Sequence, residues 1–146
     1  MRRLLGVLLV VCGLLISLVP TWAHHSFAAE FDGHKLITYT GTLKKLDWGN
    51  PHGFFYLEVK DEKGNVSKWA FEIASPNILR RSDEATRTYF IENMGKPITT
   101  TACPAKNGEL RAATQYVKFA DGRIAPMGPK TYQGDLDSEQ ILRNLK

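Results

Sequence analysis

Four histidines, His24, His25, His34 and His52, are the residues of this sequence whose positions best suit chemistry. Three of them follow closely on a segment that ends at Ala23. If the chain is cut after Ala23, the free α-amine and the Nδ1 atom of His24 can close a six-membered chelate ring on one metal ion. One further imidazole opposite this pair gives a T-shaped set of three nitrogens, a histidine brace. Such a set suits Cu(II), because nitrogen ligands bind copper above the other first-row divalent ions.

The third nitrogen is expected from His52, which lies in an Asn-Pro-His turn. Pro51 fixes one backbone angle of that turn, and Gly53 lets the chain pass closely. His34 is the second candidate. His25 could compete, because an imidazole at the second position can chelate with the amine and the intervening amide nitrogen. Candidate oxygen ligands, axial or in the outer shell, are the carboxylates of Glu30, Asp32 and Asp47.

The alternative interpretation of these histidines is a polar start to an exported chain, without a metal. Exposed histidines near a terminus are common, and sequence spacing alone cannot bring His24 within ligand distance of His52. Zinc fits less well than copper, because the Cys-His spacing of a structural zinc site is not present.

Residues 1–23 have the three parts of a secretory signal peptide. Two arginines form the basic start, Leu4 to Val19 is an uncharged and mostly apolar run, and Thr21 and Ala23 put small residues before the expected cut. The alternative is an uncleaved membrane anchor. The apolar run has 16 residues, whereas a membrane span needs about 20. We therefore expect cleavage and a periplasmic or secreted protein with no membrane span after cleavage.

The expected mature chain, His24 to Lys146, has 123 residues, which is enough for one domain. Its formal charge falls from +4 to +2 when Arg2 and Arg3 are removed, and its basic residues are spread along the chain. A nucleic-acid partner needs a basic stripe, so none is expected. Cys103 is the only cysteine of the expected mature chain, so no intramolecular disulfide is expected there, and we expect it to be a buried strand residue. The sequence contains no G-x-S-x-G, no phosphate-binding glycine loop and no H-E-x-x-H motif.

Five segments have the composition and spacing of β-strands. Gly41, in the middle of the first, indicates a bulge or a bend. In the third, Trp69, Phe71 and Ile73 share one face, which is typical of a half-buried antiparallel sheet. One or two short helices are expected between Ser75 and Asn93, because serine is a good helix cap. The strands are expected at Leu36–Leu46, Phe54–Val59, Val66–Ile73, Ile98–Cys103 and Leu110–Ala120.

This order, three strands, a helical connection and two strands, is that of an OB-type barrel. We therefore predict a mainly β fold, a small five-stranded OB-like barrel (β-β-β-α-β-β), although an open sheet or a small sandwich would use the same elements. The expected division is a signal peptide at 1–23, a barrel domain with an N-terminal histidine arm at 24–125, and a C-terminal tail at 126–146. Phe27 and Phe31 are expected to pin the arm to the barrel. The tail is expected to be peripheral.

Several short motifs give the chain a resemblance to a known family. The run Ala23-His24-His25-Ser26-Phe27, followed by Phe31-Asp32, resembles the start of a family of small secreted bacterial proteins of unknown function. That family usually shows a Gly-Trp pair after its Arg-Arg and a Pro-Gly-Asp before its fourth strand. Arg81-Ser82 and Gly95-Lys96 stand here instead, so the helical connection is expected to differ. The likeness continues through Tyr39–Thr42, Asn50–His52, Trp69–Glu72, Ser75–Asn77, Leu79–Arg81 and Asp121–Arg123.

The resemblance implies an exported single-domain protein and supplies no mechanism, but it associates the His-His start with the Asn-Pro-His turn. We therefore expect a binding protein that holds copper through His24 and His52. The alternative is a metal-free periplasmic module that binds a small molecule, peptide or envelope component on its barrel face. Four aromatic residues could line that face or simply pack in the sheet: Trp48, Phe54, Tyr56 and Trp69. An enzyme of unrecognised type is a third interpretation, and the sequence identifies neither a reaction nor a protein partner.

Overall fold

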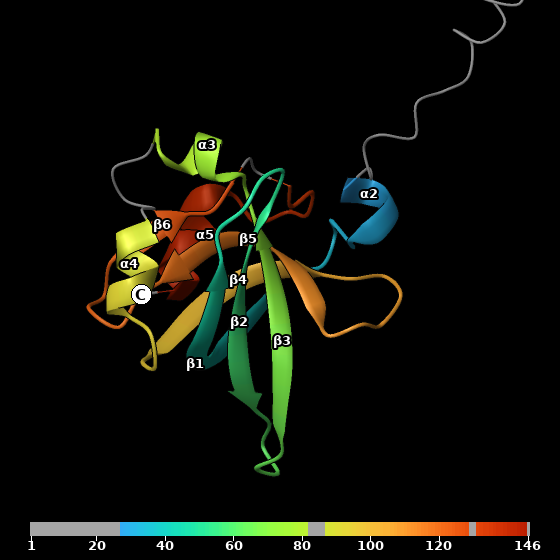
Figure 1. Cartoon of the computed structure of the whole chain (residues 1–146). Coiled ribbons are helices and arrows are strands. Elements are labelled where there is room, and N and C mark those ends of the chain that lie inside the picture. Colours follow the sequence, from blue (N-terminus) through green and yellow to red (C-terminus); the bar gives the residue numbers. More distant parts are fainter. Residues whose placement is uncertain (1–26, 82–86, 129–130, 146) are drawn as a thin grey trace, which may run out of the picture.

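The computed structural model describes residues 27–81, 87–128 and 131–145. This part of the chain is mainly β, as predicted (Figure 1). The helices are short, and most of them lie beside or between the strands. In chain order the elements are α2 (Phe27–Glu30), β1 (Ile37–Asp47), β2 (Gly53–Lys60), β3 (Val66–Ile73), α3 (Pro76–Leu79), α4 (Arg87–Glu92), β4 (Pro97–Pro104), β5 (Arg111–Lys118), β6 (Ile124–Pro126) and α5 (Ser138–Leu145).

The first five strands close into a barrel. The first half of β1 pairs antiparallel with β4, and its second half pairs antiparallel with β2. β2 then pairs with β3, and β4 with β5. A parallel pairing between β3 and β5 closes the ring, so that the strands follow one another as 1-2-3-5-4-1 around it. This is the arrangement of a five-stranded OB-type barrel, and the prediction is confirmed.

Gly41 lies where β1 passes from one partner strand to the other. It is paired with Val59 on β2 and with Ile98 on β4. A Cβ atom on residue 41 would lie 2.6 Å from the carbonyl oxygen of Glu58, so a side chain has no room there. The register shift of β1 against β2 comes after Leu43. The irregularity predicted at Gly41 thus lies slightly further along the strand.

The barrel interior is filled mainly by aromatic and branched side chains. Phe55 and Phe71 stack with their ring centroids 5.1 Å apart. Phe90, from α4, lies 5.4 Å from Phe55 and 5.2 Å from Phe119 and is fully buried. Because burying one such side chain contributes about 1.5–3 kcal/mol, this cluster stabilises the barrel.

The helical connection predicted between β3 and β4 consists of α3 and α4, with residues 82–86 outside the described part. Ser75 caps α3, because its hydroxyl oxygen accepts a hydrogen bond from the Ile78 backbone N–H at 3.3 Å. Pro76 occupies the first helical position, where its missing N–H costs nothing.

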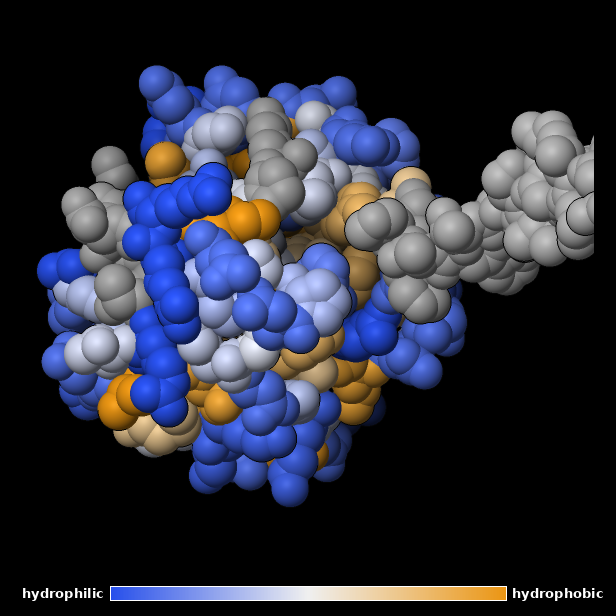
Figure 2. Space-filling model, turned by 45° about the horizontal axis from the view of Figure 1, so that its top comes forward, coloured by the Kyte–Doolittle hydropathy of each residue, from blue (hydrophilic) through white to orange (hydrophobic). Residues whose placement is uncertain are grey.

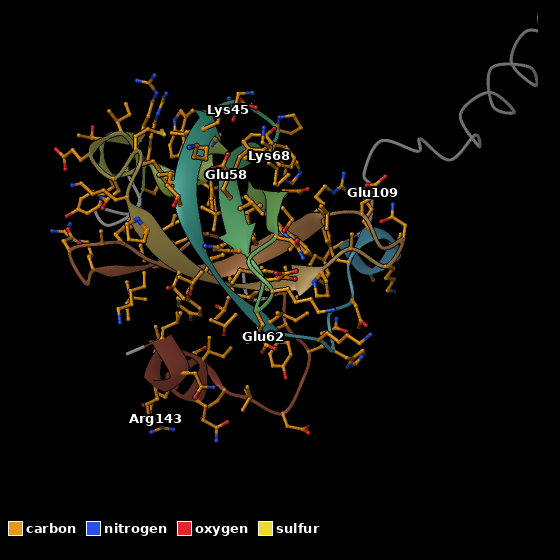
Figure 3. The ribbon with its side chains drawn as sticks, turned by 90° about the horizontal axis from the view of Figure 1, so that it is seen from below. Lys45, Glu58, Glu62, Lys68, Glu109 and Arg143 are labelled. Carbon is orange, nitrogen blue, oxygen red and sulfur yellow. The ribbon has the colours of Figure 1, made fainter. Side chains whose placement is uncertain are left out.

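The end of the chain is not peripheral, contrary to our expectation. β6 pairs with β5 beyond the point where β3 ends, and α5 packs against β4. Met127, Ile141 and Leu145 are 0%, 1% and 3% exposed, respectively. Ile141 and Leu145 are four residues apart and therefore share one helix face, whereas Arg143 points away from the barrel (Figure 3).

The face of the molecule seen in Figure 2 is mostly hydrophilic. Figure 2, which brings the top of Figure 1 forward, shows hydrophobic residues as small separate areas among hydrophilic ones. None of the helices in the described ranges is long and apolar enough to cross a membrane.

Candidate functional site

The site begins with the arm that connects the expected mature terminus to the barrel. Phe31 is 3% exposed and stacks on Phe27 with a centroid distance of 5.5 Å. Phe31 also forms an isolated bridge with Ala105, in the β4–β5 hairpin. The prediction that these two phenylalanines pin the arm is therefore confirmed.

Polar contacts hold α2 on the same hairpin. The Lys106 backbone N–H donates to the Glu30 carbonyl oxygen at 2.9 Å, and the Lys106 side chain donates to the Ala28 carbonyl oxygen at 2.6 Å. Arg111, the first residue of β5, forms an ion pair with the Glu30 carboxylate. Its guanidinium also lies over the Phe31 ring. Glu30, a sequence candidate for an oxygen ligand, therefore anchors the arm.

His52 lies in the short connection between β1 and β2, directly before Gly53 begins β2. The Asn50–Pro51 peptide bond of this connection is cis. The His52 side chain is 54% exposed, and its Nδ1 atom lies 3.1 Å from Oε1 of Glu72. The Glu72 side chain, on β3, is only 18% exposed. His52 is thus an accessible imidazole supported on one side by a carboxylate.

The β3–β5 pairing that closes the barrel places the residue that contacts His52 close to the residue that binds the arm. Ala70 is paired with Arg111, and Glu72 with Ala113, in the parallel β3–β5 ladder. With strands about 4.8 Å apart and about 3.3 Å of rise per residue, the Cα atoms of Glu72 and Arg111 are roughly 8 Å apart. Glu72 contacts His52, and Arg111 binds the arm through Glu30. We call this stretch of β3 and β5, residues 70–72 and 111–113, the closing seam.

Of the other histidines predicted as ligands, His34 is the one that lies within the described residues. His34 precedes β1 and His52 follows it, so the two histidines lie at opposite ends of an 11-residue strand. The structure does not bring them together. His24 and His25 lie outside the described residues.

The two remaining oxygen candidates are engaged elsewhere. Asp32 pairs with Lys35 and accepts from the His34 backbone N–H. Asp47 accepts from Lys45 at 2.8 Å and from the Tyr56 hydroxyl at 2.9 Å. The hydrogen bond from Lys45, with that from Tyr56, lowers the pKa of the Asp47 carboxyl.

The carboxylate beside His52, Glu72, was not among the sequence candidates. It alternates with Lys68 and Ala70 on the outer face of its strand, where an acidic residue is ordinary. The register of the β2–β3 hairpin could have identified Glu72 from the sequence. If Lys60 is paired with Val66, then Glu72 is paired with Phe54, which is two residues after His52.

Two other sequence expectations concern Cys103 and the aromatic residues. Cys103 is fully buried on β4, as expected, and burial raises the pKa of its thiol to about 12. Trp69 packs on Tyr39 and Phe71, and Trp48 packs on Phe90. These two tryptophans therefore serve packing, whereas Tyr56 lies outside and binds Asp47.

A shallow hollow lies between α2 and the β4–β5 hairpin. Its volume is about 530 Å³. Glu109, on the hairpin, lies beside α2 in Figure 3. The lining residues carry both signs of charge: Ala29, Glu30, Ala105, Lys106, Asn107, Glu109 and Arg111.

Over residues 27–81, 87–128 and 131–145, no group of three or more His, Cys, Asp or Glu side chains is arranged to hold a metal ion. The sequence predicts the further ligands of a metal site at His52 from the arm that leads to His24, which lies outside these ranges.

Fold and site together define a small closed β-barrel protein with an anchored N-terminal arm and an accessible histidine beside a carboxylate. Residues 12–114 match a family of unknown function, DUF6152, and the chain belongs to this family. No curated protein and no solved structure matches the chain.

Proposed function

We propose that this chain is an exported, single-domain copper-binding protein. The ligands are the α-amine and imidazole of His24, as the first residue of the mature chain, and the imidazole of His52. The observation that carries the proposal is the position of His52: its imidazole is accessible, contacts Glu72, and lies at the closing seam to which the arm is attached.

The length of the arm limits how far His24 can lie from α2. Phe27 is the first residue of α2, and His24 is three residues before it. A chain extends at most about 3.6 Å per residue, so three residues span up to about 10 Å. Two imidazole side chains and two metal–nitrogen bonds of about 2 Å each add to this reach. The arm is held at Arg111 by Glu30. This contact reduces the conformational entropy that the arm would lose on binding a metal ion.

The proposed ligands require export, because removal of the signal peptide frees the α-amine of His24. The chelate ring at His24 needs a free α-amine, and a cut after Ala23 supplies it. Intact-mass measurement of the exported protein should give a chain that begins at His24. A start at any other residue removes the amine–imidazole pair and with it the proposed site.

A second candidate function is a metal-free module for a small ligand. The hollow of about 530 Å³ beside α2 favours it, because its lining carries both signs of charge, with Glu109 beside the Lys106 and Arg111 side chains that hold the arm. This ligand would bind beside the arm, while the copper site would lie at the end of the arm.

The two functions are separated by titrating Cu(II) against a competing chelator with mature protein. We expect His52→Ala to weaken binding, and one residue added before His24 to weaken it as well, because the amine no longer shares a chelate ring with that imidazole. His34→Ala is the matched control: it removes an exposed histidine at the other end of β1 and should leave the affinity unchanged. Equal affinities for all four proteins would reject the copper site.

A further inference from the structure

Glu72 is less exposed than the histidine it contacts, with side chains 18% and 54% exposed, respectively. It lies in β3 between Phe71 and Ile73, which are 0% and 2% exposed, and it is paired with Phe54 across the β2–β3 ladder. The preceding residue on β2, Gly53, is buried against Ile73, and a Cβ atom there would lie 3.0 Å from the Ile73 side chain. The carboxylate therefore projects from a closely packed part of the barrel wall.

His52 lies in the connection just before this wall, with Nδ1 3.1 Å from the Glu72 carboxylate. An ionised carboxylate accepts hydrogen bonds and cannot donate them, and a neutral imidazole carries its one proton on either nitrogen. The tautomer is set by the hydrogen bond that one ring nitrogen makes. With the proton on Nδ1 facing Glu72, the lone pair is on Nε2.

We propose that Glu72 is a positioning residue that holds His52 as the Nδ1–H tautomer and leaves Nε2 as the metal-binding nitrogen. The role in metal binding rests on the copper function proposed above, but the tautomer is a property of the metal-free protein. A carboxylate behind a ligating histidine fixes the orientation of the ring and raises the basicity of the ligand, and removing such a partner typically lowers metal affinity roughly 10-fold to 100-fold.

The chain offers a matched control carboxylate. Glu58 lies on the same outer face, on β2, and is paired with Lys68. Glu58 and Lys68 are seen close together on this face in Figure 3, and Glu58 also pairs with Lys44 at 3.2 Å. Glu58→Gln therefore removes one negative charge from the face without removing the contact to His52.

The experiment is a long-range ¹H–¹⁵N correlation of the histidine rings in the metal-free mature protein, at a pH where the imidazoles are neutral. The His52 signals are assigned by their loss in His52→Ala. We expect His52 to be protonated on Nδ1 in the wild type and in Glu58→Gln. In Glu72→Ala the population should shift toward the Nε2–H form, and Glu72→Gln, whose amide oxygen still accepts, should lie between. The backbone amide spectrum of each variant checks that the barrel is intact.

A wild-type His52 protonated on Nε2, or a tautomer that is the same in Glu72→Ala, would overturn the assignment of Glu72. Copper titration of the same variants should show a loss of roughly 10-fold to 100-fold for Glu72→Ala and none for Glu58→Gln. If the tautomer responds as expected while the wild type does not bind copper, the positioning role of Glu72 stands and the copper function fails. If copper binds through His52 but the tautomer does not respond, only the role of Glu72 fails.

Discussion

Gly41 of β1 lies so close to Glu58 of β2 that a Cβ atom on residue 41 would be 2.6 Å from the Glu58 carbonyl oxygen. Contacts this short are not tolerated between a side-chain carbon and a backbone atom, so the two strands must separate if residue 41 has a side chain. Because β1 pairs with both β2 and β4 at this residue, the separation affects both ladders.

We therefore expect Gly41→Ala to lower the free energy of unfolding by about 1–3 kcal/mol, the usual cost of overpacking. Urea denaturation of the mature protein measures this. Gly49→Ala is the matched control, because a Cβ atom at residue 49 would meet nothing within 4 Å. If both variants unfold at the same urea concentration, the close approach at Gly41 does not constrain the barrel.

The buried end of the chain leads to a second prediction. Ile141 is 1% exposed on α5, which packs against β4. Ile141→Ala should lower the free energy of unfolding by about 2–5 kcal/mol, because it leaves a cavity. Asn144→Ala, at an exposed position of the same helix, should change it little, and thermal or urea unfolding distinguishes the two. Equal stabilities would mean that α5 does not stabilise the barrel.

The strands and their order could be predicted from the sequence because alternation and turn residues are local signals. The β3 strand has the bounds predicted for it, and the other four differ from the prediction by one or two residues at their ends. β6 was missed because it has three residues, too few to show a period. The burial of Ile141 and Leu145 was missed because their helix packs on a strand far away in the sequence.

The candidate site was predictable only in part, because some of its contacts join segments that are far apart in the sequence. The exposed position of His52 in a turn follows from Pro51 and Gly53, which are sequence neighbours. The contact with Glu72 and the attachment of the arm to Arg111 depend on the β2–β3 and β3–β5 pairings. The parallel closing pair in particular joins segments about forty residues apart, and no local pattern encodes it.

A third prediction concerns the thiol of Cys103. This residue is fully buried, and burial raises the pKa of its thiol to about 12. Since the thiolate is the reactive form, a disulfide reagent at pH 8 should label the native protein very slowly and the urea-unfolded protein rapidly. Rapid labelling of the native protein at the rate of the unfolded one would show that β4 opens to solvent.

The proposed copper site should depend on pH. The ligand nitrogens must be deprotonated to bind a metal ion, and the reference pKa values are about 6.5 for imidazole and about 7.7–8.0 for an α-amine. Lowering the pH therefore adds protons that compete with Cu(II), and the affinity should fall steeply below about pH 6. Competition titrations at several pH values measure this. An affinity that is constant from pH 8 to pH 5 would show that these nitrogens are not the ligands.

The most direct test of the copper site is the electron paramagnetic resonance spectrum of mature protein with one equivalent of Cu(II). We predict coordination by three nitrogens: the amine and imidazole of His24 and the imidazole of His52. His52→Ala should lose one nitrogen from the nitrogen hyperfine pattern, and a glycine added before His24 should change the spectrum again, while His34→Ala should match the wild type. A wild-type spectrum of aqueous Cu(II), or one that is identical in His52→Ala and in the extended protein, would contradict the proposed site.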